Sequence, residues 1–131
     1  MSAPWQAVAA VGWAVVGPAL IVYAATRVRR GQVGTHQVIM LTAVAVEVAV
    51  VLSFGFIEPS PRRAALVALP IFKIHLAFAI AALAGMAWQL ASRAAPRLRR
   101  FHRYSGPYVI LVWCLALLTG AYNFVFLYVL N

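Results

Sequence analysis

Apolar residues dominate the chain in four long runs that are separated by short polar turns. The runs cover Trp5–Ala25, Thr35–Ile57, Ala64–Ala91 and Tyr104–Leu130. Each run is long enough to cross a bilayer as an α-helix, which needs about 20 residues. The alternation of apolar and polar residues that marks a transmembrane β-strand is not seen. The pattern predicts an all-α fold of four transmembrane helices with antiparallel neighbours, which form a four-helix bundle and one integral-membrane domain over residues 1–131.

Composition excludes a water-soluble globular domain. Hydrophobic residues make up 65% of the chain and charged residues only 10%, whereas soluble domains carry about 25% charged residues. The net charge of +9 is compatible with nucleic-acid binding, but the basic residues lie in turns between apolar runs, where contacts with anionic lipid headgroups are typical. We therefore expect the lipid bilayer as a partner and no nucleic acid. The lone Cys114 excludes an internal disulfide and a cysteine-based metal site.

The arginines predict which ends of the helices face the cytoplasm. The first and third turns together carry eight arginines, whereas the second turn carries two. With four spans the first and third turns lie on one side, and the positive-inside rule makes that side cytoplasmic and both termini external. We expect a multi-pass protein of a bacterial inner membrane with anionic lipids at its cytoplasmic face.

Glycine and proline positions predict how the helices pack and begin. Pro107 is expected in the first turn of the fourth helix, where its missing N–H costs little. No internal repeat is convincing. Close helix approach is expected at small residues, namely Gly12, Gly17, Gly85 and Gly120.

Ionisable residues inside apolar runs are costly in a membrane and therefore mark candidate functional positions. On the second run His36, Glu47 and Glu58 are spaced by eleven residues, which turns an α-helix by only about 20° beyond three full turns. These residues are predicted to form one polar stripe that faces the other helices. Glu47 at mid-membrane is a candidate for a proton path, with a structural hydrogen bond as the alternative.

The depths of the three histidines decide which of them could share a ligand. His36 and His102 are both expected at the cytoplasmic end of a helix, whereas His75 lies roughly 25 Å further across the membrane. That separation excludes a three-histidine zinc site. Two imidazoles that face each other at one depth suit axial ligation of a haem iron, and the alternative is that each bonds lipid phosphate. His75 and Glu58 form a weaker second candidate, as a metal site, a proton shuttle or a pair that satisfies itself.

A haem b held by His36 and His102 leads to further expectations. Trp113, eleven residues after His102, is predicted to pack on the macrocycle. Two axial imidazoles leave no open position on the iron, which favours electron transfer over oxygen chemistry. The chain has no Ser-His-Asp set and no phosphate loop, so a non-enzymatic role is favoured. The propionates are expected to pair with guanidinium groups, which bind carboxylates through two parallel hydrogen bonds, here those of Arg99, Arg100 and Arg103.

Three segments occur in an order that resembles the domain-of-unknown-function 420 membrane family. They are THQVIM in the second run, FKIHLAFAIAAL in the third, and RRFHRYSGPYVILVWCLALLTGAY at the fourth. The last is similar to the family's C-terminal signature, in which a His-Arg pair precedes a helix start with proline and a span that ends in Thr-Gly-x-x-Tyr. The likeness covers roughly Gly34 to Val129, with the tyrosine one place early, and rests on His102, Arg103, Pro107, Thr119, Gly120 and Tyr122.

The resemblance implies histidines at both ends of the central helices, and one branch of the family acts in maturation of haem-A-containing cytochrome oxidase. This chain departs from the family in having four spans where five are usual, and Glu58 where an outer histidine is expected. The leading hypothesis is a small haem- or metal-associated protein of the respiratory chain. It would act in cytochrome oxidase assembly or as a cytochrome-b-like electron-transfer subunit, with cytochrome oxidase or another respiratory complex as partner.

Two alternatives come from other functional classes. One is a non-catalytic structural subunit of a larger membrane complex, which explains the small size without using the histidines. The other is a small transporter or proton path, which would need a homo-oligomer, because four helices enclose little water.

Overall fold

The computed structural model describes residues 3–130, with Arg62 described in its main chain only, and shows an all-α chain. Short 3₁₀ turns follow the second and fourth helices at Phe54–Phe56 and Pro96–Leu98, and a π-helix over Val125–Val129 continues the last one. No strand occurs between residues 3 and 130. The predicted fold class is confirmed. The helices are α1 (Trp5–Arg29), α2 (Val33–Ser53), α3 (Pro61–Ala68), α4 (Pro70–Ala94) and α5 (Arg99–Phe124).

Within residues 3–130, four segments are long and apolar enough to cross a membrane. They are Trp5–Arg29, Val33–Phe56, Pro70–Ala94 and Pro96–Val129. In an apolar 18-residue stretch of each segment, between 6% and 28% is buried within the protein, so most of the apolar surface needs lipid or another apolar partner. The chain is therefore a multi-pass membrane protein.

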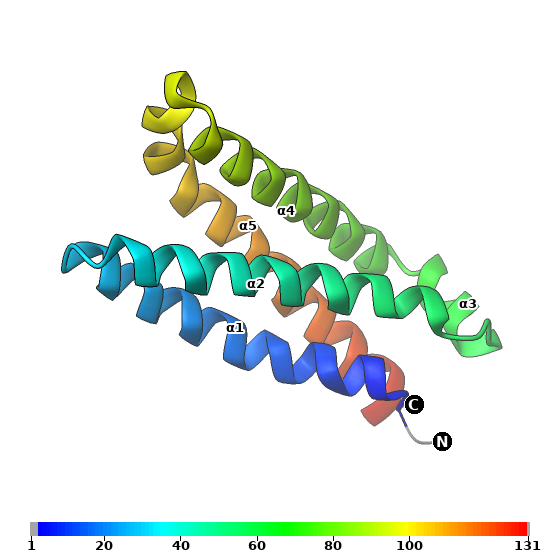
Figure 1. Ribbon diagram of the computed structural model, residues 1–131. Helices are drawn as coiled ribbons and strands as arrows, with labels where there is room; N and C mark the ends of the chain where they lie inside the picture. The colour runs from blue at the N-terminus through cyan, green and yellow to red at the C-terminus, as the bar shows by residue number, and fades with distance from the viewer. Residues whose placement is uncertain (1–2, 131) are drawn as a thin grey trace. The chain divides into compact units, whose positions relative to one another are not determined.

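The helices pair into two antiparallel hairpins, which Figure 1 shows as α1 with α2 and α4 with α5. Each hairpin belongs to its own compact unit, one over Met1–Pro59 and the other over Ser60–Asn131. The predicted antiparallel arrangement of consecutive helices is confirmed within each unit. The single domain over residues 1–131 stays a prediction.

The third apolar run differs from its prediction because it is interrupted at Pro70. One helix was expected over Ala64–Ala91. Instead α3 ends at Ala68, Leu69 is extended with φ −72° and ψ 140°, and α4 begins at Pro70. The residue before a proline disfavours the α conformation, whereas proline itself is well tolerated at the first helical position. The membrane-spanning helix is therefore α4, which begins at Pro70 and ends at Ala94, and α3 is a separate short helix.

The helix α5 of the fourth span begins at Arg99, five residues before the start of the predicted apolar run at Tyr104. The 3₁₀ turn that starts at Pro96 passes directly into α5, so the basic segment is already helical. Pro107 is consequently the ninth residue of α5, and its predicted place in the first turn is wrong. At this position it cannot donate a hydrogen bond to the main-chain oxygen of Arg103.

The connection between α1 and α2 is a glycine-dependent cap. Gly31 adopts φ +78°, a conformation that glycine reaches without steric cost. Its N–H donates to the oxygen of Val28 at 3.0 Å, and the N–H of Gln32 donates to the oxygen of Arg27 at 2.9 Å. These two bonds form a Schellman motif. The cap therefore gives the turn a defined geometry and holds Gln32 against the last turn of α1.

Small residues set the closest helix approach in the α4–α5 hairpin. A Cβ on Gly85 would lie 2.9 Å from Cγ2 of Val109. A Cβ on Gly120 would lie 3.0 Å from Cε1 of His75 in α4. The expected close approach is confirmed at these two glycines. Gly17 is buried in α1. Gly12 is exposed with nothing within 4 Å of its Cβ position, so the expectation is wrong there.

Candidate functional site

All three histidines of the chain are bonded through Nδ1 to a main-chain oxygen of the neighbouring helix. A carbonyl oxygen can only accept, so Nδ1 carries the proton in such a bond. A neutral imidazole held in this way keeps its lone pair on Nε2, which is the arrangement found at histidines that bind metals. The bonds measure 3.0, 3.1 and 3.2 Å and join His75 to Ala116, His36 to Ala24 and His102 to Gln89.

His36 and His102 occupy equivalent positions in the two hairpins. Each is the fourth residue of the second helix of its hairpin. The acceptors are equivalent too, because Ala24 and Gln89 each lie five residues before the end of the first helix. Around these two histidines the hairpins therefore share one local geometry. Sequence reasoning missed it because the side chains around the two histidines differ while the main-chain positions agree.

The surroundings of His36 are simple. The imidazole is half-buried, and its acceptor residue Ala24 is fully buried with 0% exposure. Within residues 3–130 no hydrogen bond to His36 Nε2 is found. Its tautomer is therefore set by one carbonyl group, and Nε2 is available to a ligand.

His102 differs because the side chain of Gln89 also reaches its ring. The amide finds partners for both its atoms when it donates to Nδ1 of His102 at 2.8 Å and accepts from the main-chain N–H of Gly106 at 3.0 Å. An Nδ1 that accepts this bond cannot also donate to the Gln89 carbonyl oxygen. The two arrangements exclude each other, so His102 has its lone pair on Nε2 only when the Gln89 amide turns round.

The same amide also connects His102 to Ser105. In the orientation that donates to Nδ1 of His102, the amide oxygen accepts from Ser105 Oγ at 2.7 Å and its nitrogen donates to the main-chain oxygen of His102 at 3.2 Å. In the opposite orientation the amide nitrogen donates to Ser105 Oγ at 2.7 Å. In a regular α-helix the main-chain oxygen of His102 would bond the N–H of Gly106 alone. Gln89 thus ties α4 to the first two turns of α5 through both its main chain and its side chain.

Glu47 has a partner that the sequence analysis did not identify. The indole Nε1 of Trp13 in α1 donates to Oε2 of Glu47 in α2 at 2.7 Å, and Trp13 is only 8% exposed. A structural hydrogen bond, the alternative to a proton path, is therefore present. A signal existed, since buried indoles seek an acceptor, and Trp13 lies in the run that precedes Glu47.

The predicted stripe of His36, Glu47 and Glu58 is wrong at its outer end. α2 ends at Ser53, and Glu58 lies exposed outside any helix, directly before Pro59. The α conformation is disfavoured before a proline. The predicted proton path therefore lacks its outer residue on this helix face. The predicted approach of Glu58 to the histidine of α4 involves two different units and stays a prediction.

His75 is bonded within its own hairpin. Its Nδ1 lies 3.0 Å from the oxygen of Ala116 and 3.2 Å from Oγ1 of Thr119. Thr119 donates its own hydroxyl proton to main-chain oxygens of its helix, at 2.8 Å to Leu115, and so accepts from the imidazole. No group of three or more His, Cys, Asp or Glu side chains that could hold a metal ion is found in the described part of the chain.

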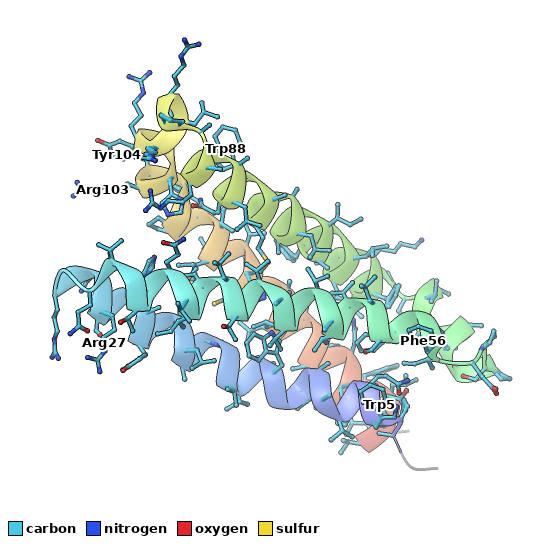
Figure 2. The ribbon with its side chains drawn as sticks, viewed as in Figure 1. Trp5, Arg27, Phe56, Trp88, Arg103 and Tyr104 are labelled. Carbon is cyan, nitrogen blue, oxygen red and sulfur yellow. The ribbon has the colours of Figure 1, made fainter. Side chains whose placement is uncertain are left out.

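The predicted partners of the haem propionates lie in the first two turns of α5, next to His102. They are Arg99, Arg100 and Arg103. All three arginines are exposed. Figure 2 shows Arg103 and Tyr104 at the turn end of the α4–α5 hairpin and Arg27 at the turn end of the α1–α2 hairpin. Trp113 is buried, with 2% exposure. The roles toward a haem that are predicted for Trp113 and for Arg99, Arg100 and Arg103 stay predictions.

A functional assignment for this chain rests on its geometry and not on comparison with known proteins. The resemblance of Gly34 to Val129 to a membrane family stays a prediction that rests on its motifs. No protein-family model, no curated protein and no solved structure matches the sequence or the fold.

Proposed function

We propose that the protein is a small haem-associated membrane protein in which His36 and His102 would hold the haem iron. The observation that supports this is their shared geometry. Each imidazole is the fourth residue of the second helix in its hairpin, and Nδ1 of each lies within hydrogen-bond distance of a carbonyl oxygen of the first helix. Histidines that bind a metal through Nε2 commonly donate Nδ1–H to such an acceptor. His102 meets this condition only when the Gln89 amide does not donate to its Nδ1.

Topology adds a second support for pairing these two histidines. With four spans, the turns of both hairpins lie on one side of the membrane, and each histidine lies one turn from the start of its helix. A haem held by these two histidines would need both imidazoles at one depth, and each imidazole lies near the turn of its own hairpin. His75 lies far from the turn of its hairpin and does not meet this condition.

The proposed site favours electron transfer or haem handling in the respiratory chain of a bacterial inner membrane. Haem iron would supply one-electron redox chemistry when held by these two imidazoles, which favours electron transfer over oxygen chemistry. The chain would orient the imidazoles through the carbonyl oxygens of Ala24 and Gln89, and its arginines would pair with carboxylates. These features suit an assembly factor of cytochrome oxidase or a cytochrome-b-like subunit.

The test is haem b binding by the purified full chain, followed by the Soret band. We expect a low-spin spectrum for the unchanged protein, and an at least tenfold weaker affinity, about 1.4 kcal/mol, for His36→Ala and for His102→Ala. His75→Ala is the matched control, because it removes an imidazole that is bonded in the same way, and it should keep the spectrum. Elemental analysis of the same samples reports any other bound metal.

Two results would contradict the proposal. The first is equal haem binding by the unchanged protein and by His36→Ala and His102→Ala. The second is the absence of a Soret band in the unchanged protein supplied with haem b. If the double variant still assembles with a partner complex and no haem is bound, the structural-subunit hypothesis is supported instead.

A further inference from the structure

Arg27 is held from two sides at the α1–α2 turn. Its Nη1 donates to Oε1 of Gln32 at 3.0 Å, and its guanidinium carbon lies 4.4 Å from the ring centroid of Tyr23. Gln32 is itself positioned, because its main-chain N–H donates to the oxygen of Arg27 in the glycine cap. Two bonds between the same two residues and a stacked tyrosine orient the guanidinium plane. Arg29 and Arg30, in the same turn, are exposed.

One edge of this guanidinium group keeps a donor without a partner. Nε of Arg27 is buried and has no hydrogen-bond partner within the described residues. Nε–H and one N–H of Nη2 point along the same edge of the planar group, whereas Nη1 is occupied by Gln32. That edge matches the two oxygens of a carboxylate or a phosphate. A buried donor is normally satisfied in a folded protein, so Nε of Arg27 marks this edge as a candidate for an acceptor.

We propose that the α1–α2 turn binds one oxyanion, a carboxylate or a phosphate, through Nε and Nη2 of Arg27. The positive charges of Arg29 and Arg30 raise the local attraction for an anion. The Schellman cap and Tyr23 orient the group before the anion arrives, which lowers the entropic cost of binding.

The position of Arg27 offers two sources for the anion. A turn at the membrane surface meets lipid phosphates. Arg27 also lies three residues after Ala24, whose oxygen holds His36, and residues three apart are neighbours on a helix surface. A ligand on His36 that carries a carboxylate could therefore place it at Arg27. The carboxylate source rests on the proposed function, whereas the phosphate source does not.

The first arm of the test measures lipid binding to the full chain in detergent by native mass spectrometry. The probe is phosphatidylglycerol, with diacylglycerol as the comparison that lacks a phosphate. Arg27→Lys keeps the charge but removes the two-donor edge, so we expect about tenfold weaker binding of phosphatidylglycerol. Arg29→Lys is the matched control in the same turn and should stay within about twofold of the unchanged protein.

The second arm measures binding of haem b and of its dimethyl ester, in which both propionates are esterified. If the anion is a propionate, Arg27→Lys weakens haem binding about tenfold and leaves the ester unchanged. Gln32→Leu keeps the charge and removes only the orienting bond, so it should weaken the same probe by about threefold. Circular dichroism checks the fold, and if Arg27→Lys is unfolded, the Gln32→Leu result decides.

Each outcome has one reading. If the variants lose phosphatidylglycerol binding, the anion at Arg27 is a lipid phosphate. If they lose haem binding but keep ester binding, the anion is a carboxylate. If they lose both, the site binds either oxyanion. Arg27→Lys and Gln32→Leu that match the control with both probes overturn the site. If the unchanged protein binds no haem, the proposed function fails, and the lipid arm alone decides on the oxyanion site.

Discussion

The two hairpins place a histidine at the same position but surround it differently. Nδ1 of His36 meets only the carbonyl oxygen of Ala24, whereas Nδ1 of His102 meets both the carbonyl oxygen and the side-chain amide of Gln89. A carbonyl can only accept, but an amide can present either its oxygen or its N–H₂ group. The comparison teaches that the main-chain geometry positions both imidazoles, while the side chain of the acceptor residue decides whether the tautomer is fixed.

The middles of the hairpins differ in a similar way. The first is tied by two side chains, the indole of Trp13 and the carboxylate of Glu47. In the second hairpin the side chain of His75 bonds the main-chain oxygen of Ala116 and lies close to Gly120. The second hairpin therefore depends more on close backbone approach, and the first on a particular donor and acceptor pair.

The largest expected effect concerns the side of the membrane on which the two turns lie. In a Cys114→Ala background, single cysteines at Arg29 and at Arg97 should both be labelled by a membrane-impermeant maleimide from the cytoplasmic side only. The reason is the excess of arginine in both turns. Labelling of the two positions from opposite sides would break the equivalence of the hairpins, because His36 and His102 would then lie at different depths.

A larger side chain at Gly120 should destabilise the second hairpin. A Cβ there already lies 3.0 Å from Cε1 of His75, so Gly120→Leu must displace the imidazole, at a cost of about 1–3 kcal/mol in the free energy of unfolding. Gly12→Leu is the matched control in the first hairpin, since nothing lies within 4 Å of its Cβ position. Unfolding by sodium dodecyl sulfate measures both, and equal midpoints would show that close approach does not hold α4 to α5.

The tie between Trp13 and Glu47 should contribute measurably to the first hairpin. A double-mutant cycle of Trp13→Phe and Glu47→Leu isolates the 2.7 Å bond, because each single change removes one of its two partners. We expect a coupling of about 0.5–1.5 kcal/mol, because interhelical hydrogen bonds in membranes are weaker than burial alone would suggest. A coupling of zero would show that the two residues act independently, and Glu47 would then again be a candidate for the proton path.

The smallest expected effect is an exchange of tautomers between the hairpins. Gln89→Ala gives His102 the surroundings of His36 and should move its proton to Nδ1, whereas Ala24→Gln introduces into the first hairpin the amide that the second one has. The free-energy change is about 1 kcal/mol, the value of one hydrogen bond. Nitrogen-15 shifts of labelled histidine in lipid nanodiscs measure it. Unchanged His102 shifts in Gln89→Ala would show that the carbonyl alone controls this ring.

Most of the fold followed from the sequence, and its errors have a common cause. Run length and hydropathy predicted four spans, because an apolar stretch of about 20 residues must satisfy its own backbone in a membrane. The errors lie at the ends of helices, at Pro70, Glu58 and Pro107. There the outcome depends on which residue next to a proline starts or stops the helix, a local competition that average hydropathy does not register.

The candidate site divides in the same way. The sequence by itself determined the four spans, the basic turns and the eleven-residue spacing of His36 and Glu47, because these depend only on composition and helical periodicity. Only the tertiary structure decided that Trp13 bonds Glu47, that Gln89 reaches His102 and that Gln32 orients Arg27. Those contacts depend on the rotation and register of one helix against its neighbour, which side-chain packing sets across the whole hairpin and no single segment encodes.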